Sequence, residues 1–135
     1  MGLEKDYEDI PGTYVFNGKR CREGYHLNKF CKSLDVAANR EIFKKDPAAY
    51  LDQYPMTDEQ RGLVERRDWL GMLQVGGNIY YTFKLATLDG LNMQDVGGAM
   101  SHMTVDDFRQ MLLDGGRKVE NNRSKAENAA NSKGT

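Results

Sequence analysis

The chain is poor in the residues that build metal and redox sites. Its 135 residues include only two cysteines, Cys21 and Cys31, and two histidines, His26 and His102. The cysteines match no zinc spacing and are too few for a disulfide scaffold, so we expect two reduced thiols. A non-haem iron site with two imidazoles and one carboxylate would use every histidine in the chain. We therefore predict that this chain supplies no metal ligands.

A charge imbalance and long apolar runs are also missing. The 19 basic and 20 acidic residues nearly cancel, which removes the electrostatic case for nucleic acid or an anionic membrane as main partner. No apolar run approaches the roughly 20 residues of a membrane span, and the first residues lack the apolar core of a signal peptide. We expect a cytoplasmic protein.

The remaining pattern is helical, without β-alternation long enough to build a sheet. We predict an all-α fold with one compact multi-helix domain over residues 9–116, after a flexible N-terminus at 1–8. Three glycines and Pro11 surround a short apolar patch in residues 9–24, and this composition predicts an extended arm over 9–23. Residues 117–135 are polar, so we expect a tail that is disordered or strapped across a partner.

Polar capping residues and glycines predict where the helices begin and end. A Thr57–Gln60 pair has the spacing of a capping box, in which two side chains satisfy two backbone N–H groups reciprocally. The other predicted boundaries are a helix start at Asn39, a start at Asp46 before Pro47, an end at Gly76, a start at Asn78 and a start near Asn92.

The segment from Gly76 to Gly90 is unusual because it is apolar almost all round. Lys84 is its only charge between Val75 and Asp89. A surface helix normally presents one polar face to water, so either the domain wraps this helix completely or another chain covers part of it. Gly90 permits a sharp turn after the helix, and Leu91 and Met93 would then stand at the tip of a loop over 89–94. Core packing and partner contact both explain an apolar tip.

No group of side chains predicts catalysis by this chain alone. Cys31 follows His26 by five residues, which places the two about 140° apart around a helix and argues against a nucleophile pair. The Gly76-Gly77-Asn78 turn follows no strand and precedes no Walker lysine, so a helix cap explains it better than a phosphate site. We assign no catalytic residue here.

Short motifs nevertheless follow one another in a specific order from Asp9 to Gly116. They are Asp9–Thr13 with Val15-Phe16, Gly24-Tyr25 with Leu27-Asn28 and Phe30, Arg40-Glu41 with Phe43, Ala49–Asp52, Arg67-Asp68, Gly76–Asn78 with Tyr80, Lys84-Leu85, Asp89-Gly90, and Met100–Thr104. Together they resemble the small α subunit of protocatechuate 4,5-dioxygenase, which belongs to the extradiol, aromatic-ring-opening dioxygenases.

The resemblance implies a helical subunit that works with a larger catalytic β subunit. That partner would hold Fe(II) and cleave the ring of protocatechuate or a related catechol acid with O₂. The α subunit would lie over the active-site mouth of its partner and exclude water. Gly90, Leu91 and Met93 would form the part of this lid nearest the substrate. Met93 stands where we would expect an aromatic side chain. The residues expected at the partner interface are Tyr14, Phe16, Asn78, Tyr80 and Tyr81.

Two other functions fit the same sequence. A fold does not fix a function, so the chain could be a stand-alone helical interaction module without a dioxygenase partner. A self-contained enzyme using Cys31 or a histidine is the third hypothesis, and it would require activity in the isolated chain.

Overall fold

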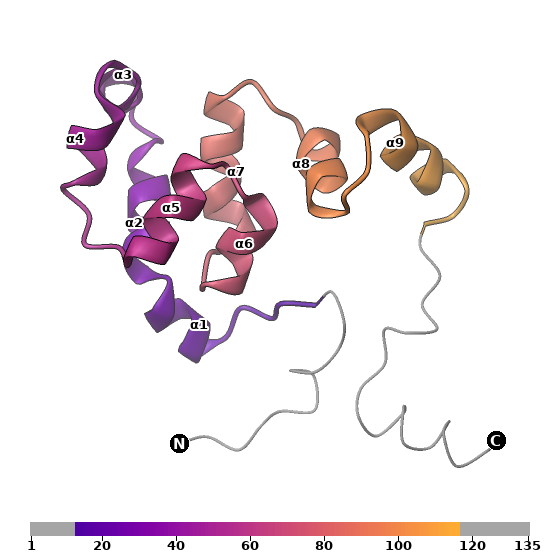
Figure 1. The fold of residues 1–135 in the computed structure, drawn as a ribbon, viewed down its shortest axis with the longest axis horizontal. Coiled ribbons are helices and arrows are strands. Elements are labelled where there is room, and N and C mark those ends of the chain that lie inside the picture. The colour runs from indigo at the N-terminus through magenta and orange to yellow at the C-terminus, as the bar shows by residue number, and fades with distance from the viewer. Residues whose placement is uncertain (1–12, 117–135) are drawn as a thin grey trace, which may run out of the picture. The chain divides into compact units, whose positions relative to one another are not determined.

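The computed structural model describes residues 13–116, and all regular secondary structure within them is α-helical (Figure 1). The all-α prediction is therefore confirmed. The helices are α1 (Gly18–Glu23), α2 (Tyr25–Ser33), α3 (Ala37–Lys45), α4 (Pro47–Leu51), α5 (Asp58–Glu65), α6 (Trp69–Gln74), α7 (Ile79–Leu88), α8 (Met93–Met100) and α9 (Val105–Leu113).

The chain divides into two compact units. Residues 16–110 form one unit, while 13–15 and 111–116 are the described parts of the second. In the second unit, Gly115 and Gly116 have positive φ angles of 99° and 90° and follow the end of α9. The predicted N-terminal segment 1–8 and tail 117–135 lie outside the described residues.

The core of the 16–110 unit is built by helices that pack in pairs. Contacts join α2 to α7, α3 to α4, α5 to α6, and α6 to both α7 and α8, and Figure 1 shows α5 and α6 crossing in front of α2 and α7. Three aromatic rings tie α2, α3 and α4 together. Phe30 meets Phe43 and Tyr50 edge to face, with ring centroids 5.3 and 6.0 Å apart, a favoured geometry for buried aromatic rings.

Most predicted helix boundaries are confirmed. The Asp46 carboxylate accepts a hydrogen bond from Ala49 N–H, and Thr57 and Gln60 form the predicted capping box. Asn78 begins α7 by accepting from Tyr80 N–H, and Asn92 begins α8. Each of these side chains satisfies a backbone donor that has no partner inside its helix.

Two boundary predictions are wrong. Asn39 does not begin a helix, because α3 starts at Ala37 and the Asn39 amide donates instead to Ser33 O at 2.9 Å. The predicted arm over 9–23 is also too long, because α1 occupies Gly18–Glu23. Asn17 caps this helix by accepting from Arg20 N–H at 3.0 Å, a signal masked in the sequence by the glycine that follows it.

The turn before α7 is fixed by a close backbone approach. Gly76 has a positive φ angle of 96°, and a Cβ atom on Gly24 would lie 1.9 Å from Gly76 O. Only glycine allows the start of α2 to approach this turn so closely. Helix α6 ends at Gln74, and Gly76 lies in the turn just after it. The predicted helix end at Gly76 is therefore correct to within two residues.

Two buried amides then bind the turn to its surroundings. Asn28 Nδ2 donates to Gly76 O at 3.1 Å, and Asn28 Oδ1 accepts from Asn78 N–H at 2.9 Å. Gln60 Nε2 donates to Glu23 O at 2.8 Å and to Val75 O at 3.1 Å. Because these side chains are buried, water cannot replace the hydrogen bonds if an amide is lost.

We expect Asn28→Leu to destabilise the protein by about 2–5 kcal/mol, because it leaves a carbonyl and an N–H buried without partners. Urea unfolding followed by circular dichroism measures the change. Asn39→Leu is the matched control, since Asn39 is half-buried and donates to one carbonyl only, and we expect it to cost less than about 1.5 kcal/mol. Equal losses for the two variants would contradict this account of the turn.

Candidate partner-docking surface

The domain covers only one side of helix α7, and the side that it leaves exposed is not polar. Its inner side is formed by Thr82, Leu85 and Ala86, which are buried in the core. Its other side remains open to solvent, although the side chains there are largely apolar. Tyr80 is 67% exposed and Ile79 is 39% exposed. The helix therefore presents an uncovered apolar face, the arrangement expected of a surface that another molecule covers.

This open side of α7 forms one wall of a concave surface of about 810 Å³, here called the α7 groove. The groove is lined by Ile79, Tyr80, Phe83, Lys84, Thr87 and Leu88 of α7, Leu34 and Asp35 after α2, Arg40 and Lys44 of α3, and Met93 of α8. The α7 residues are spaced i, i+1, i+4, i+5, i+8 and i+9, so they form a stripe along one face of the helix.

An ion-pair cluster lies at the side of the groove. Asp35 accepts from Lys32 and from Lys84, each at 2.7 Å, and Lys84 Nζ also lies 4.7 Å from the centre of the Tyr80 ring. Hydrogen bonds from Lys32 and then Lys84 lower the pKa of the Asp35 carboxyl, which stays ionised at neutral pH. The single charge of α7 is therefore already paired and helps to hold the Tyr80 ring.

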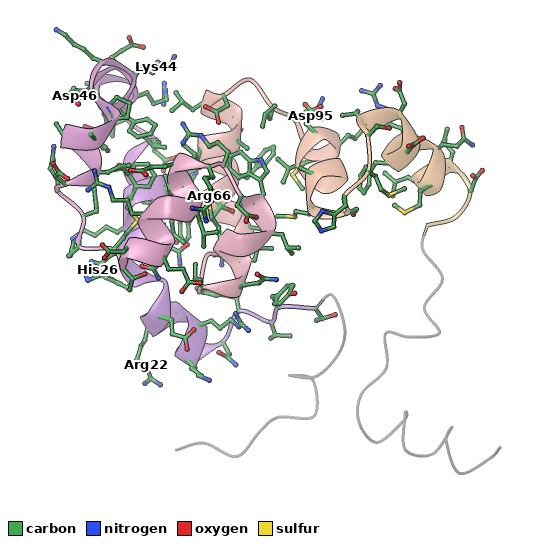
Figure 2. The ribbon with its side chains drawn as sticks, in the orientation of Figure 1. Arg22, His26, Lys44, Asp46, Arg66 and Asp95 are labelled. Carbon is green, nitrogen blue, oxygen red and sulfur yellow. The ribbon has the colours of Figure 1, made fainter. Side chains whose placement is uncertain are left out.

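Two further cations line the groove without such a strong acidic partner. Both hydrogen bonds of the Arg40 guanidinium go to backbone carbonyls, at 2.8 Å to Leu34 O and 3.1 Å to Asp35 O. Lys44 lies 4.0 Å from the Glu41 carboxylate, and both side chains are exposed. Figure 2 shows Lys44 on α3. Exposed ion pairs at this distance contribute little to stability. The positive charge of Lys44 is therefore largely available to a binding partner.

A second, smaller concave surface is lined by residues of α1, α2 and the start of α7. This α2 hollow has a volume of about 350 Å³ and is lined by Phe16, Cys21, Tyr25, Asn28, Lys29, Lys32, Asn78 and Tyr81. The five residues expected at a partner interface therefore do not share one concave surface. Tyr80 lies in the groove, whereas Phe16, Asn78 and Tyr81 lie in the hollow. Tyr14 belongs to the other structural unit.

The turn after α7 is held by Arg67, whose partner the sequence does not reveal. Arg67 Nε donates to Asp89 Oδ2 at 2.7 Å, and its Nη1 donates to Val64 O at 2.6 Å. Gly90 then takes a positive φ angle of 79°. This ion pair fixes the end of α7 to the junction between α5 and α6.

The predicted loop over residues 89–94 is shorter than expected. Helix α8 begins at Met93, because Asn92 and Asp95 form a reciprocal capping box. Leu91 is half-buried against the core, whereas Met93 is 57% exposed. Of the two apolar residues expected at the tip, the structure leaves only Met93 open to a partner.

The donor set of residues 13–116 does not fit a metal centre. No three His, Cys, Asp or Glu side chains of this region lie close enough to hold an ion. In Figure 2, His26 on α2, Asp46 before α4 and Asp95 on α8 lie well apart. Burial raises the pKa of the Cys31 thiol to about 12, so this cysteine is protonated at neutral pH and a poor nucleophile.

Tyr80 and Met93, which were expected at the interface and in the lid, both line the groove, but the sequence did not indicate the charged side of the groove. Asp35, Arg40 and Lys44 look like ordinary solvated helix residues in the sequence, because their approach to α7 depends on how α2, α3 and α7 pack. The lone Lys84 of α7 was the available signal. A single cation on an apolar helix often has an acidic partner from another element, and here that partner is Asp35.

None of the helices in the described part of the chain is long and apolar enough to cross a membrane. The comparison with protein families then defines the class. Residues 27–113 match the model of the LigA subunit of the aromatic-ring-opening dioxygenase LigAB, and the chain belongs to this family. The resemblance to the small subunit of extradiol dioxygenases is confirmed. All the residues that line the α7 groove lie inside the matched region.

The chain is also similar to a curated protein, the gallate dioxygenase of Pseudomonas putida. The two are 31% identical over 101 residues, which make up 75% of this chain and 30% of the relative. The chain thus spans less than a third of the length of that relative. In that relative, the similar region is therefore part of a much longer polypeptide.

Proposed function

We propose that this chain is the non-iron-binding component of an extradiol dioxygenase, and that it covers the active-site mouth of a LigB-type catalytic component. The observation that carries the proposal is the uncovered apolar face of α7 within the region that matches the LigA family. A second support is the gallate dioxygenase relative, in which the similar region occupies only 30% of the polypeptide. The rest of the gallate dioxygenase polypeptide is long enough to contain a catalytic component.

The substrate of the proposed enzyme is protocatechuate or a related catechol acid such as gallate. Ring cleavage with O₂ would take place on the catalytic component, where Fe(II) is expected. The described part of this chain has no side-chain group that fits the metal, so we assign it no step of iron chemistry.

The contribution of this chain would be physical closure. An apolar cover removes water from the neighbourhood of a charged reaction intermediate, which strengthens electrostatic interactions there and limits side reactions. Met93 would be the side chain nearest the substrate, with Gly90 and Leu91 shaping the turn that positions it. The Arg67–Asp89 ion pair would set the position of this turn relative to the core.

Reconstitution tests the proposed function directly. The chain and the LigB-type large subunit from the same source are produced separately and together, and O₂ consumption with protocatechuate and with gallate is measured. We expect no activity from this chain alone and at least about a hundredfold higher activity in the mixture than in the large subunit alone. Full activity of the large subunit without this chain, or activity of this chain alone, would contradict the proposal.

Met93 tests the proposed lid within the same complex. We expect Met93→Ala to lower kcat/KM for the preferred catechol acid by about tenfold or more, because the apolar cover over the substrate becomes shorter. Val36→Ala, which shortens an exposed apolar side chain outside both concave surfaces, should leave kcat/KM unchanged. A Met93→Ala complex with the kinetic constants of the unmodified complex would show that Met93 does not approach the substrate.

A further inference from the structure

The α7 groove has the chemistry of a docking site for one kind of segment. Its α7 wall is largely apolar, because Ile79, Tyr80, Phe83 and Leu88 line it together with Lys84 and Thr87. These residues span ten successive positions, about 13.5 Å of helix for nine steps of 1.5 Å each. A stripe of this length matches roughly two and a half turns of a second helix packed along α7.

The charge of the groove differs from that of the whole chain. Three basic residues and one acidic residue line it, although the complete sequence has a formal net charge of −1. The acidic residue, Asp35, is already shared between Lys32 and Lys84. Arg40 and Lys44 can therefore form ion pairs with a binding partner, whereas the one carboxylate of the groove is already paired with two lysines.

We infer that the α7 groove binds an amphipathic segment of the LigB-type component whose apolar side chains are flanked by Asp or Glu. The apolar side chains would pack on Ile79, Tyr80 and Phe83, and the carboxylates would pair with Arg40 and Lys44. This inference rests on the proposed function and adds to it the surface and the chemistry of the contact. Met93 at the end of the same groove would connect this contact to the lid.

Charge complementarity is tested by reversing one cation. We expect the Lys44→Glu variant to fold normally, because the Lys44 side chain is 54% exposed and its one ion pair is the 4.0 Å contact with Glu41. We expect a Kd for the LigB-type large subunit about fivefold higher at low salt, with the difference shrinking as salt is added. Lys45→Glu is the matched control, because Lys45 carries the same charge on α3 but does not line the groove.

The apolar α7 wall of the groove is tested independently by Tyr80→Ala. Tyr80 is largely exposed in the free chain, so its removal should not disturb folding, which thermal melts verify. We expect about a thirtyfold higher Kd, as is typical of a central aromatic anchor in an interface. Ile42→Ala is the control, since Ile42 is similarly exposed but lies outside the groove.

A photo-crosslinker in place of Tyr80 identifies the segment that is bound. In the complex with the large subunit, we expect one crosslinked peptide that contains both apolar and acidic residues. A basic peptide, or no crosslink, would overturn the inference. So would a dimer of this chain that Tyr80→Ala dissociates, or binding of free protocatechuate to the isolated chain that Lys44→Glu abolishes.

The outcomes separate the two proposals. If the unmodified chain fails to bind the large subunit, both the proposed function and the groove assignment are wrong. If it binds and supports activity but Lys44→Glu and Tyr80→Ala leave Kd unchanged, only the groove assignment is wrong.

Discussion

The structure depends on one buried amide. Asn28 donates to Gly76 O and accepts from Asn78 N–H, and so holds the turn from which α7 starts. A backbone turn inside a protein must have its polar groups paired, and here a side chain from α2 supplies both bonds. The glycine contact between Gly24 and Gly76 makes the approach possible. Together they fix which side of α7 enters the core.

The orientation of α7 has a direct consequence for function. With Thr82, Leu85 and Ala86 inward, the outward side of the same helix carries Ile79 and Tyr80. Exposed apolar side chains cost free energy in water, so a helix of this composition is best explained by a partner that covers it. We propose that the chain contributes a shaped cover to a dioxygenase whose chemistry takes place on another component. Membership of the LigA family supports this proposal.

Much of the fold could be predicted because the determinants are local. The capping residues Asp46, Thr57, Asn78 and Asn92 act within three residues of themselves, so the sequence reveals them. Asn39 was misplaced because its amide bonds backward to Ser33, a choice that depends on the turn between α2 and α3.

The candidate site was harder to predict because it is assembled from distant segments. Met93 was expected from the apolar turn after α7 and Tyr80 from the family resemblance, and both line the groove. Arg40 and Lys44 could not be predicted, because only the packing of α3 near α7 gives them a shared surface. The partner of Arg67 could not be predicted for the same reason, because Asp89 is 22 residues away.

The central claim is that the outer side of α7 is open in the free chain and covered in the enzyme. Hydroxyl-radical footprinting measures this through the oxidation rates of individual side chains in the free chain and in the complex with the LigB-type subunit. We predict fast oxidation of Tyr80 and Met93 in the free chain, strong protection of both in the complex, and slow oxidation of the fully buried Met72 in each. Equal oxidation of Tyr80 and Met93 in the free chain and in an active complex would contradict the claim.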